Sequence, residues 1–302
     1  MSVNNFSAAK YGKKKFFTDD RIFNSIIKSL LAIMVFLIMY PLLYTLFASL
    51  SSGWAVDTGQ VRFFPVDFTT SAYTTVASDP MFWRSYLNSV ILTATGSTWS
   101  MFLAITAGYA YTKKSMPGFK LFVFILIFNM WFSAGMIPMF NNLRELNLLN
   151  FFGLIIMGGA GSFTVIVIKT AFMTIPDGLL EAAYVDGAND LQAFWFVAVP
   201  SIKPTIAVFW FFAAIGRWNS WLWASIMLSR EEQIPLQLYL RNYIILRQDM
   251  MEAADVLAGS ITHSPTTLIY ALIFTSMIPI FIAFPFMQKF FKRGIFEGGI
   301  KA

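Results

Sequence analysis

Residues 176–200 read PDGLLEAAYVDGANDLQAFWFVAVP and lie between two long apolar stretches of the chain. Pro176 ends the preceding apolar stretch, and Asp177 is placed to cap the helix that residues 179–185 favour. Gly187 permits a bend or a left-handed residue, and Asn189 begins a second short helical pattern. We therefore predict two short helices lying against one face of a membrane domain.

The composition explains why this polar segment stands out. The chain has 302 residues, of which 57% are hydrophobic and only 13% are charged, whereas ordinary soluble domains are about 25% charged. Because there is no cysteine, disulfide frameworks and thiolate metal ligands are excluded, and a single histidine, His263, excludes most histidine-based metal sites. The composition indicates a protein whose surface faces lipid.

Six stretches are long and apolar enough to cross about 30 Å of hydrocarbon, which takes about 20 residues. They span residues 28–50, 88–112, 119–140, 150–173, 204–228 and 266–288. None alternates with a period of two, which excludes a transmembrane barrel of strands. The predicted fold class is an all-α membrane protein with six transmembrane helices.

No Gly/Ser-rich linker, low-complexity tract or internal repeat divides the chain, so we predict a single membrane domain. Residues 1–83 would form a cytoplasmic N-terminal segment, the first transmembrane helix and an outer loop. Residues 84–290 would form a five-helix core that carries a cytoplasmic loop at residues 177–200. Residues 291–302 would form a cytoplasmic tail.

The basic residues predict the orientation, because cytoplasmic segments carry an excess of lysine and arginine. With both termini in the cytoplasm, fifteen basic residues fall inside: Lys10, Lys13, Lys14, Lys15, Arg21, Lys28, Lys113, Lys114, Lys120, Lys169, Lys203, Lys289, Lys292, Arg293 and Lys301. Six fall outside: Arg62, Arg84, Arg144, Arg230, Arg241 and Arg247. The net charge of +6 thus reflects topology, and the basic N-terminus is interpreted as a membrane anchor, with no nucleic acid as a partner.

Segment 176–200 then faces the cytoplasm, where it could bind either lipid or protein. Its charges are four acids with no basic residue before Lys203: Asp177, Glu181, Asp186 and Asp190. The cytoplasmic leaflet is itself anionic and attracts basic segments. Docking of another protein is therefore the better interpretation.

A spaced motif within the segment resembles the EAA loop of binding-protein-dependent ABC importer permeases. It consists of Glu181, Ala182 and Ala183, then Gly187 after three residues, Val197 after nine, and finally Val199 and Pro200. Val197 and Val199 replace the usual Ile and Leu, and every spacing matches. The resemblance implies the ABC importer type I permease fold.

In that family the loop is a coupling helix that sits in a cleft of the ATPase subunit. The resemblance assigns this coupling to Glu181, Ala182, Ala183, Asp186, Gly187 and Ala188, with Pro200 ending the loop. The chain has no phosphate-binding G-x-x-x-x-G-K-[ST] loop. The chain would therefore be no enzyme and bind no cofactor, and ATP and Mg would belong to the partner ATPase.

Three further stretches resemble the smaller permease subunit of maltose-type sugar importers. They are RSYLNSVILT at residues 84–93, the pair Trp218-Asn219, and FFKRGIFEGGIKA at residues 290–302, where Glu297 departs from the usual small or apolar residue. This resemblance implies a multi-pass protein of a prokaryotic plasma (cytoplasmic or inner) membrane. Its implied partners are a second homologous permease, two ATP-binding subunits, an external solute-binding protein and membrane lipid.

Polar groups within predicted spans are costly and point to a substrate path. The candidates combine amide or guanidinium donors with flat aromatic faces suited to a sugar ring: Asn129, Trp131, Arg217, Trp218, Asn219 and Trp221. Two alternatives stay open. The tryptophans of the fifth span could form an interfacial aromatic belt, and Arg217 could pair with a helix carbonyl or a neighbouring subunit.

The predicted outer loops carry arginines and no lysine, which is compatible with an acidic oligosaccharide as cargo. Glu231 and Glu232 are interpreted as a solvated loop rather than an acid–base pair. Asp249, Glu252 and Asp255 are interpreted as contacts for a binding protein rather than as calcium ligands.

The predicted function is that of a permease subunit of an ATP-driven ABC importer for a sugar or oligosaccharide. The alternative is a self-sufficient secondary transporter or channel for a small polar solute. Such proteins use ion sites within the membrane, whereas the carboxylates of this chain lie outside its predicted spans.

Overall fold

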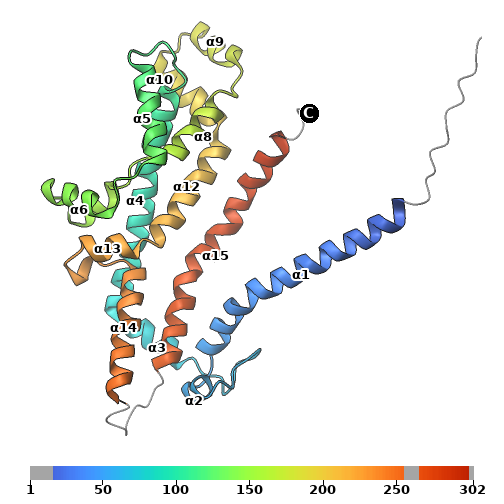
Figure 1. Cartoon of the computed structure of the whole chain (residues 1–302), viewed down its shortest axis with the longest axis vertical. Coiled ribbons are helices and arrows are strands. Elements are labelled where there is room, and N and C mark those ends of the chain that lie inside the picture. Colours follow the sequence, from blue (N-terminus) through green and yellow to red (C-terminus); the bar gives the residue numbers. More distant parts are fainter. Residues whose placement is uncertain (1–15, 255–264, 299–302) are drawn as a thin grey trace, which may run out of the picture.

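The computed structural model describes residues 16–254 and 265–298, with side chains placed in residues 21–246 and 266–290. This part of the chain is helical and elongated (Figure 1). The longer helices are α1 (Phe16–Ser49), α4 (Pro80–Ala110), α5 (Phe119–Trp131), α12 (Lys203–Trp218), α14 (Leu236–Ala254) and α15 (Pro265–Gly298). The shorter helices include α2 (Gly53–Asp57), α3 (Ser71–Ser78), α6 (Met136–Glu145), α7 (Phe151–Ile156), α8 (Ser162–Phe172), α9 (Asp177–Val185), α10 (Asp190–Gln192), α11 (Val199–Ser201) and α13 (Trp221–Met227).

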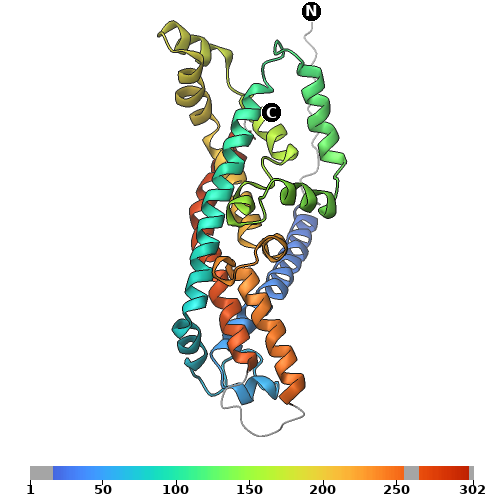
Figure 2. The same cartoon turned by 90° about the vertical axis from the view of Figure 1, so that its left-hand side faces the viewer.

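Helix α4 is the central helix of the bundle, and its most extensive contacts are with α12 and α8. Small residues let the backbones approach closely, as is usual between membrane helices. A Cβ atom on Gly108 would lie 2.8 Å from Cγ2 of Ile168 on α8. In both views α4, α12 and α15 run along the long axis of the molecule (Figures 1 and 2).

Helix α1 leaves this bundle and touches it only near one end (Figure 1). There Ala48 packs with Ala55, Val56 and Val61, and the rings of Tyr44 and Tyr270 meet edge to face at 5.6 Å. Its apolar residues 22–38 are exposed. This face suits lipid or a second membrane subunit.

Three described helices are long and apolar enough to cross a membrane: residues 21–49, 80–110 and 266–290. Two sharply bent helix pairs also pass when each pair is taken together. They are α8 with α9, bent by 72°, and residues 190–201 with α12, bent by 78°. The described part of the chain therefore holds three candidate spans, or five if each bent pair counts as one span. The structure therefore supports a multi-pass membrane protein.

Three of the predicted spans are not continuous helices. The stretch 119–140 ends as a helix at Trp131 and turns at Gly135, where φ is 86°. The stretch 150–173 breaks between α7 and α8, because the run 157–161 contains three glycines. The stretch 204–228 breaks at Asn219 and Ser220. Hydropathy does not detect these breaks, since apolar residues flank each of them.

Helix α14 lies in a stretch that the sequence predicts as a polar outer loop. Its start joins α4, because the backbone N–H of Leu236 donates to the buried Ser89 Oγ at 2.7 Å. The Tyr239 hydroxyl donates to Asp79, the residue that caps α4. Figure 2 shows α14 alongside the lower part of α15. The alternation of polar and apolar residues hides this helix from a hydropathy criterion.

Candidate functional site

The segment 177–200 forms a compact helical unit at one end of the molecule (Figure 1). It contains α9, α10 and a π-helical turn at Ala193–Ala198, followed by α11. The axes bend by 72° on entry from α8 and by 78° on exit into α12. We call it the coupling segment, after the role that its resemblance to the EAA loop implies. The prediction of two short helices is confirmed.

Local caps hold the turn between α9 and α10. Gly187 has φ 83°, a left-handed value that favours glycine. Asn189 and Gln192 form a reciprocal capping box, in which each backbone N–H donates to the other side chain at 2.9 Å. The prediction that Asp177 caps α9 is wrong: Pro176 is the capping residue, and Asp177 lies in the first helical turn. Its carboxylate there still complements the helix dipole.

The outward face of the coupling segment combines apolar and acidic side chains. Val185 is 87% exposed and Leu191 is 69% exposed. Glu181 and Asp186 are exposed beside them. Tyr184 donates to Asp190 at 3.0 Å, and this bond raises the pKa of the Tyr184 hydroxyl to about 12. An apolar surface with an acidic rim suits a protein partner better than an anionic lipid surface.

The inward face of the segment is anchored in the bundle. The ring of Phe194 is buried. Its centroid lies 4.7 Å from the ring centroid of Tyr109 on α4 and 6.2 Å from that of Phe172 on α8. Ala193 and Ala198 are fully buried nearby. Packed side chains therefore connect the segment to α4 and α8.

A second candidate region surrounds Arg217 in the middle of the bundle. Its guanidinium donates to the carbonyls of Leu154 at 2.7 Å and Met157 at 2.6 Å, and to Ser100 Oγ at 3.4 Å. These two carbonyls lie at the end of α7, where helix carbonyls lack partners within the helix. Arg217 therefore closes the break between α7 and α8, as the alternative of a helix carbonyl partner anticipated.

Arg217 also lines a cavity of about 340 Å³, which we call the Arg217 cavity. Its walls include Ser100 from α4, Gly158 and Thr164 from the α7–α8 region, and Trp223 from α13. The sequence did not single out Ser100 or Thr164. The glycine run before α8 was the available signal for this break.

The other proposed path residues lie in different surroundings. Trp218 is buried and donates to the Ser276 carbonyl at 3.2 Å, so it belongs to the packing of α12 on α15. Asn219 donates back to Ile215 at 3.0 Å. Trp221 lies beneath the guanidinium of Arg241, whose Cζ is 4.6 Å from the ring centroid. None of the three lines the Arg217 cavity.

Asn129 and Trp131 lie at the end of α5, and the Trp131 side chain is 77% exposed. Neither residue lines the Arg217 cavity. The structure therefore separates the candidate path residues into three groups: α5, the Arg217 cavity, and the junction of α12 with α13.

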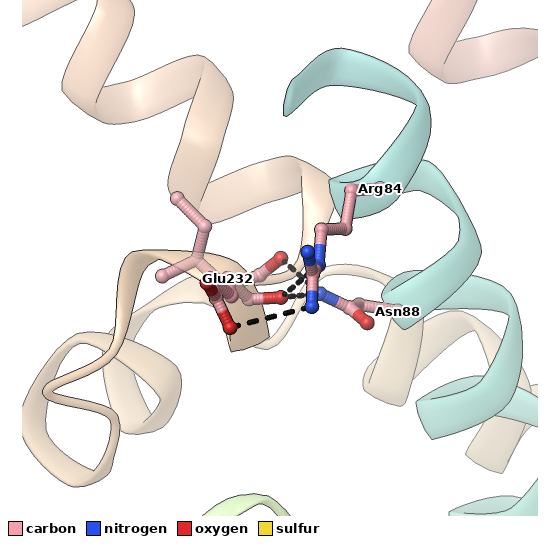
Figure 3. A network of polar contacts seen from close by, with 4 residues as sticks. Arg84, Asn88 and Glu232 are labelled. Atoms are coloured by element: carbon pink, nitrogen blue, oxygen red, sulfur yellow. Dashed lines mark hydrogen bonds and ion pairs between the residues drawn. The ribbon is translucent and has the colours of Figure 1, made fainter. Parts of the chain in front are cut away.

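Polar contacts near the start of α4 fix the loop before α14 (Figure 3). Arg84 donates to the Glu232 backbone carbonyl at 3.1 Å and approaches its carboxylate at 3.4 Å. Asn88 donates to the carbonyls of Glu232 at 2.9 Å and Ile234 at 3.1 Å. Glu232 thus has a structural partner, in keeping with the interpretation of an exposed loop rather than an acid–base pair.

Among the described residues, no three His, Cys, Asp or Glu side chains gather in a way that would hold a metal ion. The side chains of Asp249 and Glu252, and the residues Asp255 and His263, lie outside the described part of the chain.

The chain is similar to known transport proteins. The polygalacturonan/rhamnogalacturonan transport system permease protein YtcP of Bacillus subtilis (strain 168) is 30% identical over 93% of this chain and 99% of its own length. The maltodextrin transport system permease protein MalD of Streptococcus pneumoniae (strain ATCC BAA-255 / R6) is 26% identical over 87% of this chain and 90% of its own.

A chain in the crystal structure of a bacterial ABC transporter involved in the import of the acidic polysaccharide alginate matches with a TM-score of 0.82. It is 39% identical, and the match covers 94% of this chain and all of that one. Residues 109–297, more than half of this chain, match a family of membrane transport components. This chain therefore belongs to the binding-protein-dependent transport system inner membrane component family, with the type I permease fold of ABC importers.

Proposed function

We propose that this chain is a permease subunit of an ATP-driven importer that translocates an oligosaccharide delivered by an external solute-binding protein. The observation that carries the proposal is the coupling segment, an exposed helical unit anchored between α8 and α12 in a chain of this family. A second homologous permease and two ATP-binding subunits would complete the assembly. ATP and Mg would bind in those partners, in the plasma membrane of a prokaryote.

We propose six crossings with both termini in the cytoplasm. They would be α1, α4, α5, α7 with α8, α12 with α13, and α15. The proposal rests on the excess of lysine and arginine near one side and on the lengths of the apolar helices. The division of the chain at residues 83 and 290 remains part of this proposal.

Coupling would use Glu181, Ala182, Ala183, Asp186, Gly187 and Ala188, with Pro200 at the end of the segment. Closure of the ATPase subunits would push on the exposed face of α9. Phe194, packed against α4 and α8, would pass that movement to the core. The spans would then alternate between outward and inward access.

The substrate path would include the Arg217 cavity, because its guanidinium, hydroxyls and Trp223 provide polar donors beside an aromatic ring. Asn219 and Trp221 would lie toward the outer opening of this cavity. Trp218 would pack α12 against α15. Asn129 and Trp131 are exposed in this chain alone, so their part in the path requires the second permease to enclose α5.

The proposed substrate class is an acidic oligosaccharide built from uronate units. The 39% identical structural relative belongs to a transporter for an acidic polysaccharide, and the 30% identical relative is named for polygalacturonan and rhamnogalacturonan. The segments that the proposed topology places outside carry arginine and no lysine. Guanidinium groups recognise carboxylates through paired hydrogen bonds.

The alternative of a self-sufficient secondary transporter requires an ion-binding group within the membrane. The three long apolar spans, 21–49, 80–110 and 266–290, contain no Asp or Glu. Uptake by this chain alone in liposomes, with no ATPase subunit, would establish the alternative and overturn the proposal.

The coupling assignment is tested with Glu181→Lys in the complete transporter. A cation in place of this exposed carboxylate reverses the charge presented to the ATPase subunit. We expect substrate-stimulated ATP hydrolysis and uptake to fall about tenfold while unstimulated hydrolysis is retained. The measurement is the ratio of stimulated to basal ATPase activity in proteoliposomes.

The matched control is Glu145→Lys, which makes the same charge reversal at an exposed position at the end of α6. Its stimulation ratio should equal that of the unaltered protein. Equal stimulation in both variants would show that Glu181 takes no part in coupling.

A further inference from the structure

A second polar cavity, apart from the Arg217 cavity, opens between α13 and the start of α14. Its volume is about 330 Å³, and Arg230, Arg241, Asn242 and Glu231 line it. We call it the α13–α14 cavity. Two of the arginines that the sequence places in outer loops thus meet in one hollow, although they lie on different elements.

The floor of this cavity is packed into the hydrophobic core. Leu228, Ile234 and Leu238 line it and belong to the buried hydrophobic cluster under α4 and α7. The loop that carries Arg230 is fastened to α4 by the contacts of Asn88 and Arg84 with Glu232 (Figure 3). The backbone that carries the polar rim is therefore held in place before any ligand arrives, which reduces the ordering entropy lost on binding.

Within the described part of the chain, the guanidinium groups of Arg230 and Arg241 keep N–H donors that could meet a ligand. Of the carboxylates whose side chains the structure describes, none lies within ion-pair distance of Arg230 or Arg241. Arg84 differs, because it is already engaged with Glu232. Cζ of Arg241 lies over the ring of Trp221, 4.6 Å from its centroid. A cation–π contact of this kind orients the guanidinium and leaves its N–H donors for a ligand.

The charges around the cavity favour an anion. Two arginines against one glutamate, Glu231, leave a net charge of +1 at the rim. Carboxylates match the planar donor pattern of arginine. Glu231 and Asn242 provide an acceptor and an amide suited to sugar hydroxyls.

We infer that the α13–α14 cavity binds a carboxylate of a uronate unit in the incoming oligosaccharide, with Arg230 and Arg241 as its partners. The inference rests on the proposed function and adds a substrate contact distinct from the Arg217 cavity. In Figure 1, α13 and the start of α14 lie about midway between α9 and the end of the molecule that carries α2 and α3. A site there would hold one unit of an extended acidic chain while another unit enters the spans.

The test uses the complete transporter in proteoliposomes with two substrates, a uronate oligosaccharide and its methyl ester. In the double variant Arg230→Gln/Arg241→Gln, the KM for the acidic substrate should rise about tenfold. A change of this size corresponds to the loss of roughly one charge-assisted hydrogen bond. The KM for the ester should stay unchanged. The variant Arg241→Lys keeps the charge without the paired geometry and should give a smaller rise.

The matched control is Arg62→Gln, because Arg62 is an exposed arginine of a predicted outer loop that does not line the cavity. It should leave both KM values unchanged. An equal rise for acid and ester would assign the two arginines to the fold or to the binding protein and overturn the inference. An unchanged acidic KM would also overturn it.

A third outcome would show that the α13–α14 cavity binds an anionic lipid headgroup rather than the sugar. The effect of the double variant would then follow the content of anionic phospholipid in the vesicles rather than the carboxyl state of the sugar, and the inference would fall. In each of these cases ATP-dependent uptake of the ester by the variant leaves the proposed function standing.

Discussion

Two glycine turns, one before α8 and one after α9, are held in opposite ways. Before α8, Gly158 and Gly159 have φ 87° and 41°, and a distant residue, Arg217, closes the break. After α9, Gly187 has φ 83°, and neighbours in the sequence hold the turn through a capping box. The first turn adjoins buried residues of the bundle, whereas the second is exposed.

The difference follows from access to water. The break before α8 leaves carbonyls of Leu154 and Met157 beside buried side chains, where an unpaired acceptor is costly. A donor must then come from wherever the fold can supply one. The exposed turn at Gly187 can use water as well as its own caps, so short-range sequence is enough to form it.

The largest effect is expected from Arg217→Leu, which removes the donors from the partly buried break before α8. Each of the two carbonyls would lose its hydrogen-bond partner, which costs about 1–3 kcal/mol per carbonyl. Part of this cost is offset because the variant no longer has to desolvate a cation. The free energy of unfolding should therefore fall by about 3 kcal/mol. Thermal unfolding of the purified complex without substrate measures this loss. Arg217→Lys should lose less, since the ammonium still donates to one carbonyl. An unchanged unfolding temperature in the leucine variant would show that the turn before α8 does not depend on Arg217, and would contradict the difference drawn between the two turns.

Gly187→Val should have the next largest effect, about 2 kcal/mol on the local turn, because a β-branched residue is strained at φ 83°. The loss should appear as uncoupling, with basal ATPase activity retained and substrate stimulation lost. Gly59→Val is the matched control, since Gly59 also has a positive φ, 68°, and open space around it. If Gly59→Val uncouples equally, backbone strain in general and not the coupling segment explains the result.

A pair of N-cap variants compares the two regions directly. Asn150 accepts from the buried Gly153 N–H at 2.8 Å at the start of α7, and Asn189 accepts from the exposed Gln192 N–H at 2.9 Å. Asn150→Ala should cost about 1.5 kcal/mol and Asn189→Ala about 0.5 kcal/mol, because water replaces only the exposed cap. Unfolding temperatures of the two variants provide the measurement. The reverse order would contradict the role given to water.

The smallest effect is expected from Tyr184→Phe, which removes the exposed hydrogen bond to Asp190 and should cost about 0.5 kcal/mol. Because the folded pKa of Tyr184 is raised to about 12, this contribution is present below pH 10, the ordinary tyrosine value, and is lost as the pH rises through 12. Amide hydrogen exchange in α9 should quicken slightly. Faster exchange in α8 as well would mean that this bond also stabilises the bundle.

The exposed coupling segment was predictable because its determinants are local. Gly187, Asn189 and the spacing after Glu181 lie within a few residues of the structure they form. The single error, the cap at Asp177, was a shift of one position, as helix ends commonly allow. The acidic charge of its surface was also visible in the sequence.

The interior was less predictable because its determinants are distant in the chain. Arg217 meets carbonyls some sixty positions earlier, and Asn88 reaches a loop more than 140 positions later. Helix α14 escaped detection because its apolar residues face α4 and α15 while its other side is polar. The two arginines of the α13–α14 cavity come together only when that helix folds back.

By itself, the sequence determined that this chain is a helical membrane protein, that it carries an EAA-type loop, and that it belongs with importer permeases. These features depend on composition, hydrophobic length and short spacings, which survive in a linear chain. Only the tertiary structure decided where the helices break, which polar groups pair with the carbonyls at the break before α8, and which arginines line the α13–α14 cavity. Such choices depend on burial, since a carbonyl or a guanidinium acquires its partners only after the helices have packed.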